Sequence, residues 1–315
     1  MRPEPFLKNL ISSAFRHVVV SAIIFGPLAG IVLGCWYFAH EPVGWRLAVV
    51  LSLVFTGRFY AKIFGVSLGY HRYLTHAGFT ANPVVEFMML LAASTAMQGP
   101  CMNWAMVHRQ HHAHADKPGD PHSPLEGFWH AHCFWLYSWP FIRKIKPPFD
   151  RPEYKLARFM NNTFVLWVAL DAFSMYAIFG WVGLVWLWLG CNAMVNQLTY
   201  AVNSVCHMYG KRNFDTPDQS RNFKWLFFLS GEIWHNNHHR NPTCAAHGLM
   251  KGEPDVAYGL IKLMNRWHWI SDVQHPTERT YRGMVSGARP AYAVATPDLA
   301  ALSLEPALAP GGPST

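Results

Sequence analysis

The sequence predicts an all-α integral membrane protein with four transmembrane helices, and three observations support this fold class. Hydrophobic residues make up 51% of the 315 residues and charged residues only 14%, whereas an average soluble domain carries about 25% charged residues. Apolar stretches long enough to cross a bilayer as helices recur along the chain. Histidines gather at helical spacing beyond the ends of these stretches, which places polar chemistry next to a membrane.

The first two predicted spans cover residues 18–39 and 47–69. Residues 18–39 are uncharged and match the length of about 20 residues that a helix needs to cross a bilayer. A signal peptide is the less compatible alternative, because the stretch exceeds a typical apolar signal region and no A-x-A cleavage site follows it. In the second span we expect Arg58 and Lys62 at the membrane interface, because charges are costly at the bilayer centre. Residues 1–17 are basic and predict a cytosolic N-terminal segment.

Residues 163–180 and 181–202 predict the third and fourth spans, separated by a tight turn at Gly180. Asp171 lies inside the third span and is expected to face other helices or a partner. Residues 82–104 are too short an apolar stretch for a span and predict an interfacial or re-entrant helical hairpin. Four spans return both termini to one side, and the excess of Lys and Arg places that side in the cytoplasm.

Composition also limits the partners. The net charge of +8 favours anionic partners such as lipid head groups, a nucleotide-bearing carrier or an acidic electron donor. Nucleic acid is disfavoured because the basic residues form no long run.

The six cysteines are scattered without a C-x-x-C pair, so neither a disulfide framework nor a thiolate metal site is expected. Residues 286–315 are rich in Ala, Pro and Gly and predict a disordered tail, which leaves residues 18–285 as a single membrane domain.

Three histidine clusters carry the chemistry. His108-Arg109-Gln110-His111-His112 and His235-Asn236-Asn237-His238-His239 each place histidines at i, i+3 and i+4, so that three imidazoles share one helical face. His71 and His76 form the third cluster. On an α-helix their five-residue separation turns the side chains apart by about 140°, which suits two neighbouring ions better than one.

A polar stripe on the fourth predicted span points to the same site. Its members recur at steps of three or four residues and are Asn192, Asn196, Tyr200, Asn203 and His207. Because polar groups in lipid are costly, we expect the stripe to face the metal site. Hydrogen bonding between helices is the alternative for its upper residues, but it does not account for Asn203 or His207.

The number of histidines predicts two metal ions. Eight in the clusters and His207 as a ninth exceed the capacity of one ion, which takes about four to six ligands. Nitrogen ligands with open positions suit non-haem iron and oxygen activation. Oxidation of an unactivated C–H bond needs a metal-bound oxidant, so no catalytic side chain beyond the metal ligands is expected. Asp120 lies in a turn-rich loop and is expected to orient a ligand imidazole, with a solvated loop as the alternative. The residues thus predict an O₂-dependent lipid-oxidising enzyme.

The clusters resemble the three histidine boxes of the membrane fatty acid desaturases, and most closely those of the acyl-CoA (stearoyl-CoA-type) Δ9 branch with its bacterial acyl-lipid relatives. The segment Asn203-Ser204-Val205-Cys206-His207-Met208-Tyr209-Gly210 is similar to the one that supplies an additional histidine ligand in that branch. Asp120-Pro121-His122 and Gly231-Glu232 match the flanks of its boxes. The resemblance covers residues 45 to 275.

The resemblance implies four transmembrane helices with a cytosolic helical cap that holds a histidine-rich di-iron site. Asn203 is expected to reach one iron through a water, and Asp120 and Glu232 to support the ligands. The implied ligands of the two iron ions are His71, His76, His108, His111, His112, His207, His235, His238 and His239. His114 and His247 are expected to lie outside this set.

The implied activity is the introduction of a cis double bond, at Δ9 by resemblance, into a saturated acyl chain. O₂ is the expected co-substrate, and acyl-CoA is the favoured substrate. Carrier-protein and lipid-linked acyl groups would also suit a basic cytosolic face. No cytochrome b5 domain is recognised in the sequence, so the expected electron donor is external, such as a ferredoxin, cytochrome b5 or a flavin reductase. The expected location is a bacterial inner membrane, with the catalytic face in the cytoplasm.

Two departures and two rival functions accompany the resemblance. Asn237 stands where many relatives have an aromatic residue, and Trp234 where many have Phe, which bears on the electron donor and chain length rather than on the metal site. A hydroxylase of the same histidine-rich superfamily would use similar ligands, but the segment from Asn203 to Gly210 argues against it. A non-catalytic metal carrier would need polar ligands within its spans, whereas these clusters lie beyond the span ends.

Overall fold

The computed structural model describes residues 4–41, 43–138, 154–226, 230–285 and 289–292. These residues are mostly helical, as the sequence predicted, and form two compact units. The first unit comprises Met1–Ala77 and Ala81–Ser204, and the second comprises Gly78–Thr80 and Val205–Thr315. Two short strands, β1 (Thr80–Ala81) and β2 (Ile270–Ser271), pair in a two-stranded sheet.

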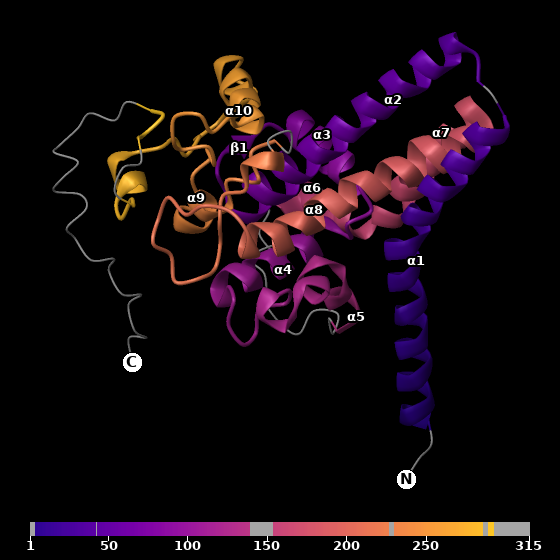
Figure 1. Cartoon of the computed structure of the whole chain (residues 1–315), viewed down its shortest axis with the longest axis horizontal. Coiled ribbons are helices and arrows are strands. Elements are labelled where there is room, and N and C mark those ends of the chain that lie inside the picture. The colour runs from indigo at the N-terminus through magenta and orange to yellow at the C-terminus, as the bar shows by residue number, and fades with distance from the viewer. Residues whose placement is uncertain (1–3, 42, 139–153, 227–229, 286–288, 293–315) are drawn as a thin grey trace. The chain divides into compact units, whose positions relative to one another are not determined.

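The first unit holds the long apolar helices of Figure 1. In chain order its elements are α1 (Glu4–His40), α2 (Trp45–Phe64), the π-helix η1 (Gly65–Thr75), α3 (Pro83–Ser94), α4 (Cys101–His114), the 3₁₀ turn η2 (Pro124–Glu126), the π-helix η3 (His130–Phe134), α5 (Trp135–Ser138), α6 (Lys155–Asn162), α7 (Phe164–Val182), the π-helix η6 (Gly183–Gly190) and α8 (Cys191–Met208).

Among the described residues, three helices are long and apolar enough to cross a membrane: His17–His40, Trp45–Thr75 and Phe164–Met208. The third contains both later spans that the sequence predicted, and it is not straight. Gly180 has φ 60° and ψ −145°, outside the helical region, a conformation that glycine adopts at little cost. The helices on either side of this break, α7 and η6, pack against each other.

Glycines allow the apolar helices to approach closely. A Cβ added at Gly183 would lie 2.0 Å from the carbonyl oxygen of Met175, so only glycine, which has no Cβ, fits at this position. Where α1 packs against η6, a Cβ at Gly34 would lie 2.5 Å from the indole of Trp186. Small residues at such crossings let backbones pack directly, which is the main source of helix association in lipid.

Arg58 and Lys62 are paired with an acidic residue inside the first unit. Arg58 Nη2 lies 2.8 Å and Lys62 Nζ 2.9 Å from Oδ2 of Asp171. Lys62 is 2% exposed and also donates to the carbonyl of Thr95. The prediction for Asp171 is confirmed, since it faces other helices. The sequence did not foresee this counter-charge from α7, and the position of the two cations at the membrane interface stays a prediction.

The helix α3 fixes the position of η1. A Cβ at Gly65 would lie 2.4 Å from the backbone nitrogen of Ala93, so the two backbones touch. The hydroxyl of Tyr70 lies 3.1 Å from that of Ser94 and donates to the carbonyl of Gly99 at 3.2 Å. Because η1 carries His71 and ends directly before His76, this close packing sets the position of both histidines.

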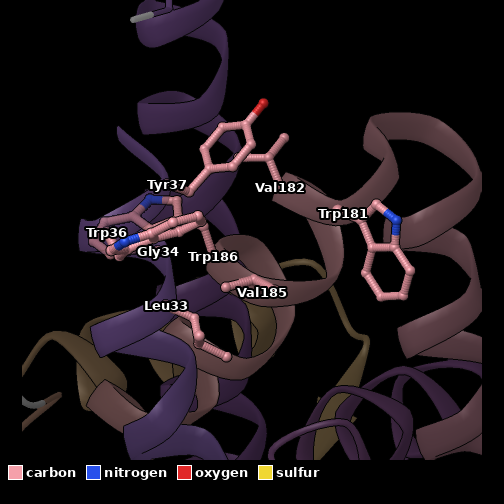
Figure 2. A pocket seen from close by; sticks show the side chains of 8 residues that line it. All are labelled: Leu33, Gly34, Trp36, Tyr37, Trp181, Val182, Val185 and Trp186. Atoms are coloured by element: carbon pink, nitrogen blue, oxygen red, sulfur yellow. The ribbon is translucent and has the colours of Figure 1, made fainter. Parts of the chain in front are cut away.

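An apolar pocket of about 200 Å³ lies where α1 meets the turn between α7 and η6 (Figure 2). Its lining residues are Leu33, Gly34, Trp36, Tyr37, Trp181, Val182, Val185 and Trp186. Histidine and carboxylate side chains do not contribute to the lining, so this pocket has no ligands for a metal.

The second unit contains short elements joined by hydrogen-bonded loops. They are η7 (Lys224–Leu226), α9 (His235–Arg240), α10 (Val256–Arg266), β2 and η8 (Glu278–Tyr281). Residues 289–292 belong to this fold, since Lys251 donates to the carbonyl of Arg289 and Ala291 to that of Leu249. The predicted disordered tail from residue 286 was therefore wrong for these four residues, because backbone pairing holds them. Residues 286–288 and 293–315 lie outside the described part.

Candidate metal centre

A π-helical turn brings His71 and His76 together. The amide of His76 donates to the carbonyl of His71 five residues earlier, at 3.1 Å. This wider turn places residues five apart nearly above one another, and the two ring centroids lie 4.9 Å apart. The sequence-based expectation that they diverge was wrong because it assumed α-helical geometry.

Four histidines of the first unit converge from α4, from η1 and from the residue that follows η1. The ligand atoms of His71, His76, His108 and His112 all lie within 4.8 Å of one another. The Nε2 atoms of His108 and His112 are 3.1 Å apart. Burial lowers the pKa of His108 well below its usual value, and its histidine neighbours, with His71 foremost, lower the pKa further. A neutral imidazole is the form that binds metal, so this environment favours the ligand form.

His111, the remaining histidine of this box, contacts a carboxylate. Its Nδ1 lies 2.9 Å from Oδ1 of Asp120, and both side chains are buried. Asp120 is fixed in turn by the amides of Asp116 and His122, at 2.8 and 3.1 Å. The ring of His122 lies 4.2 Å from that of His111. Asp120 therefore lies where the sequence predicted it, beside a box histidine, and His122 is an additional neighbour.

Three histidines of the second unit form a matching cluster. His207 and His239 each place Nε2 3.0 Å from the Nε2 of His235. His239 Nδ1 lies 3.2 Å from Oδ2 of Asp218, which is 6% exposed. Sequence reasoning missed Asp218, because it lies outside the boxes, 21 residues before His239.

His238 lies against another histidine of the same unit. The ring centroid of His247 is 4.4 Å from that of His238, and His247 is fully buried. Nδ1 of His247 is 3.5 Å from a carboxylate oxygen of Glu232. Glu232 therefore lies beside His247, and its support of a box histidine stays a prediction. The sequence places His122 and His247 about ten residues after His111 and His238, a parallel spacing that could have drawn attention to both.

The short helix α9 is held by asparagines. Oδ1 of Asn237 accepts hydrogen bonds from the side-chain Nδ2 groups of Asn213 and Asn222, both at 2.9 Å. Its Nδ2 donates to the carbonyl of His247 at 2.8 Å and to Glu253 at 2.7 Å. A helix of six residues has little stability of its own. The side chain of Asn237 therefore does much to fix the histidines of α9.

In the part of the chain that the structure describes, the upper part of the polar stripe does not make the hydrogen bonds between helices that were the alternative expectation, and its orientation towards the metal site stays a prediction. Asn192 and Asn196 are buried, and within the described residues neither side-chain amide has a hydrogen-bond partner. A neighbouring face of α8 does make a hydrogen bond to another segment, because the hydroxyl of Thr199 accepts a bond from the side chain of Gln98 at 2.9 Å. Asn203, predicted to reach iron through a water, is half-buried at the end of the first unit.

The spacing of the imidazoles fits metal ligands. Two nitrogens about 2.1 Å from one ion at a right angle would lie about 3.0 Å apart. The observed Nε2 separations are 3.0 to 3.1 Å in both clusters. Carboxylates at the Nδ1 atoms of His111 and His239 leave the Nε2 atoms of these rings to face a metal. The donor set therefore suits a transition metal that takes nitrogen ligands, such as iron.

Comparison with known proteins agrees with this geometry. The family model of fatty acid desaturases matches residues 44–260. The chain is 36% identical to an acyl-CoA C20 Δ5-desaturase of Anemone leveillei, over 78% of this chain and 80% of the relative. It is 35% identical to a Δ9 desaturase-like protein of Arabidopsis thaliana, over 70% and 75%. It is 32% identical to a hex-5-enoyl-[acyl-carrier protein] acetylenase of Moorena producens, over 84% and 87%. With its converging histidines and its apolar helices, the chain belongs to the fatty acid desaturase family, whose members are oxidoreductases of lipid metabolism.

Proposed function

We propose that this protein is an O₂-dependent acyl desaturase that introduces a cis double bond, at Δ9, into a saturated acyl-CoA chain. The observation that carries the proposal is the pair of imidazole clusters, each with a box histidine against a buried aspartate. Such a donor set has no ordinary structural use, whereas oxidation of an unactivated methylene requires a metal-bound oxidant.

In this proposal two iron ions are held by His71, His76, His108, His111, His112, His207, His235, His238 and His239, with Asn203 reaching one of them through a water. The irons would supply the oxidising power, with electrons from an external donor such as a ferredoxin, cytochrome b5 or a flavin reductase. The role of Asp120 and Asp218 is to accept the Nδ1–H of His111 and His239, which fixes the tautomer and the ring orientation. Glu232 would support the neighbouring His247 by charge, with its carboxylate 3.5 Å from Nδ1 of that ring.

The membrane topology in this proposal has four spans. A straight helix from residue 164 to 208 would have 45 residues and a length of about 68 Å, more than twice the apolar thickness of about 30 Å of a bilayer. The break at Gly180 and the packing of α7 on η6 support two antiparallel spans instead. Both termini and the histidine clusters then lie on the cytoplasmic side, in a bacterial inner membrane.

The choice of acyl carrier and bond position rests on the substrates and bond positions for which the relatives are named. Two of them are named for acyl-CoA substrates and Δ5 positions, three as Δ9 desaturase-like and one for an acyl-carrier protein. The net charge of +8 suits the anionic CoA moiety. We therefore place acyl-CoA first, with carrier-protein and lipid-linked chains as alternative outcomes of the test.

The test is expression in a desaturase-deficient host, with double bonds located by mass spectrometry. The intact chain should yield a new monounsaturated acid, and His112→Ala should abolish it and lower bound iron. His114→Ala is the control, because this side chain is exposed. His247, which the sequence suggested as a second control, is unsuitable because it is buried against His238. A hydroxylated product, or full iron content in His112→Ala, would contradict the proposal.

A further inference from the structure

The helix α10 has two apolar faces, and only one of them is used inside the second unit. Ala257 and Ile261 are fully buried, and Tyr258 is 4% exposed. This face packs towards β2. A surface helix of a soluble protein would present charged and polar residues on the other side.

The opposite side of α10 is instead an apolar stripe. Val256, Leu260, Leu263 and Trp267 follow one another at steps of four, three and four residues, which places them on one helical face. Val256 is 51%, Leu263 39% and Trp267 50% exposed. Trp269 extends the stripe, with its ring 4.8 Å from that of Trp267 and 47% of its surface exposed.

Cations border this stripe, and the nearest acidic residues along the chain lie just beyond its ends, at Asp255 and Asp272. Lys262 and Arg266, both exposed, lie one turn apart along one side of the stripe. From Val256 to Ser271 the sequence contains no Asp or Glu. Exposed tryptophans with flanking Lys and Arg are the composition of helices that lie in the plane of a membrane interface.

The chain itself connects this unit to a segment that is apolar enough to cross a membrane. The second unit begins at Val205, inside the helix Phe164–Met208 that is apolar enough to cross a membrane. We propose that the exposed stripe of α10, together with Trp267 and Trp269, docks onto the surface of a bilayer that contains anionic lipids. The apolar side chains would enter the interface, and Lys262 and Arg266 would bind phosphate groups. This inference does not depend on the proposed desaturase activity.

The experiment uses the full-length chain in lipid nanodiscs. Leu263→Cys is labelled with an environment-sensitive fluorophore in a Cys35→Ser background, because Cys35 is the exposed cysteine and the other five are buried. The nanodiscs contain phosphatidylcholine with phosphatidylglycerol, with or without brominated acyl chains. A label at Asp215→Cys, whose carboxylate is 99% exposed, gives the reference spectrum of a water-exposed site in the same unit.

We expect a blue-shifted emission at position 263 that brominated lipid quenches. Exchange of Lys262 and Arg266 for Glu, or omission of phosphatidylglycerol, should move the emission towards the reference spectrum. A water-like emission that brominated lipid leaves unchanged would overturn the proposal. A blue-shifted emission without quenching would also overturn it, because it would show that protein, such as a second copy of the chain, covers the stripe. Equal quenching in the charge-reversed variant would overturn the role of anionic lipid.

Discussion

Removal of the Asn237 side chain should destabilise the second unit strongly. This asparagine is 1% exposed and makes four polar contacts of 2.7 to 2.9 Å, two as acceptor and two as donor. In Asn237→Ala the carbonyl of His247 and an amide hydrogen of Asn222 lose their partner. The carboxylate of Glu253 keeps the hydrogen bonds from the backbone amides of Leu249 and Met250, so it loses only one of its hydrogen-bond partners.

The size of the effect follows from these orphaned groups. A buried polar group without a partner costs about 1 to 3 kcal/mol, so the substitution should lower the free energy of unfolding by about 3 to 5 kcal/mol. For a chain of this size that corresponds to a melting temperature lower by about 5 to 8 °C. Asn237→Asp keeps the shape but places a second carboxylate 2.7 Å from Oε2 of Glu253. It should be at least as destabilising at neutral pH.

Thermal unfolding in detergent measures this effect directly with a thiol-reactive dye. Five of the six cysteines are buried and become reactive when the protein unfolds, and Cys35→Ser removes the exposed one. Asn265→Ala, a half-buried asparagine on α10, is the matched control. If Asn237→Ala melts within about 1 °C of this control, as ordinary surface substitutions do, the asparagine network does not hold α9.

Three further predictions concern the first unit. Gly65→Ala should lower the free energy of unfolding by about 1 to 3 kcal/mol through overpacking, because its Cβ would lie 2.4 Å from the Ala93 backbone. Gly57→Ala, with nothing within 4 Å, should be neutral or stabilising in the same melting assay. Asp120→Asn should weaken iron binding about 10- to 100-fold without removing a ligand, which metal titration would show; unchanged affinity would contradict the role of the carboxylate. Burial raises the pKa of Glu86 despite an opposing hydrogen bond, so its contribution to stability is lost as the pH rises through the folded pKa. Glu86→Gln should therefore melt at a higher temperature than the parent near neutral pH. The gap should close towards the ordinary Glu pKa of 4.5, and a gap that is independent of pH would refute the assignment.

The sequence predicted the helical fold and the membrane character because both follow from composition and from the length of apolar stretches. It drew attention to Asp120, which lies beside His111, since a carboxylate in a turn after a histidine box is a local signal; its support of a metal ligand stays a prediction. It could not show that Asp171 neutralises Arg58 and Lys62, because that pairing joins helices more than 100 residues apart. The π-helical turn at His71 was also out of reach, since it depends on the packing of η1 against α3 rather than on the local pattern.

In the structure, the histidines that can bind metal are distinct from the carboxylates that orient their rings. Spacing along the chain identified the box histidines, because the i, i+3, i+4 pattern depends only on helix geometry. Their orientation depends on loop residues such as Asp120 and Asp218, which come from different units and share no motif. Loss of a proposed ligand such as His112 should reduce the amount of iron bound even at saturation. Loss of Asp218 in Asp218→Asn should instead raise the iron concentration needed for saturation while the amount bound at saturation stays the same. A lowered iron content at saturation in Asp218→Asn would show that the carboxylate is itself a ligand rather than a support for His239.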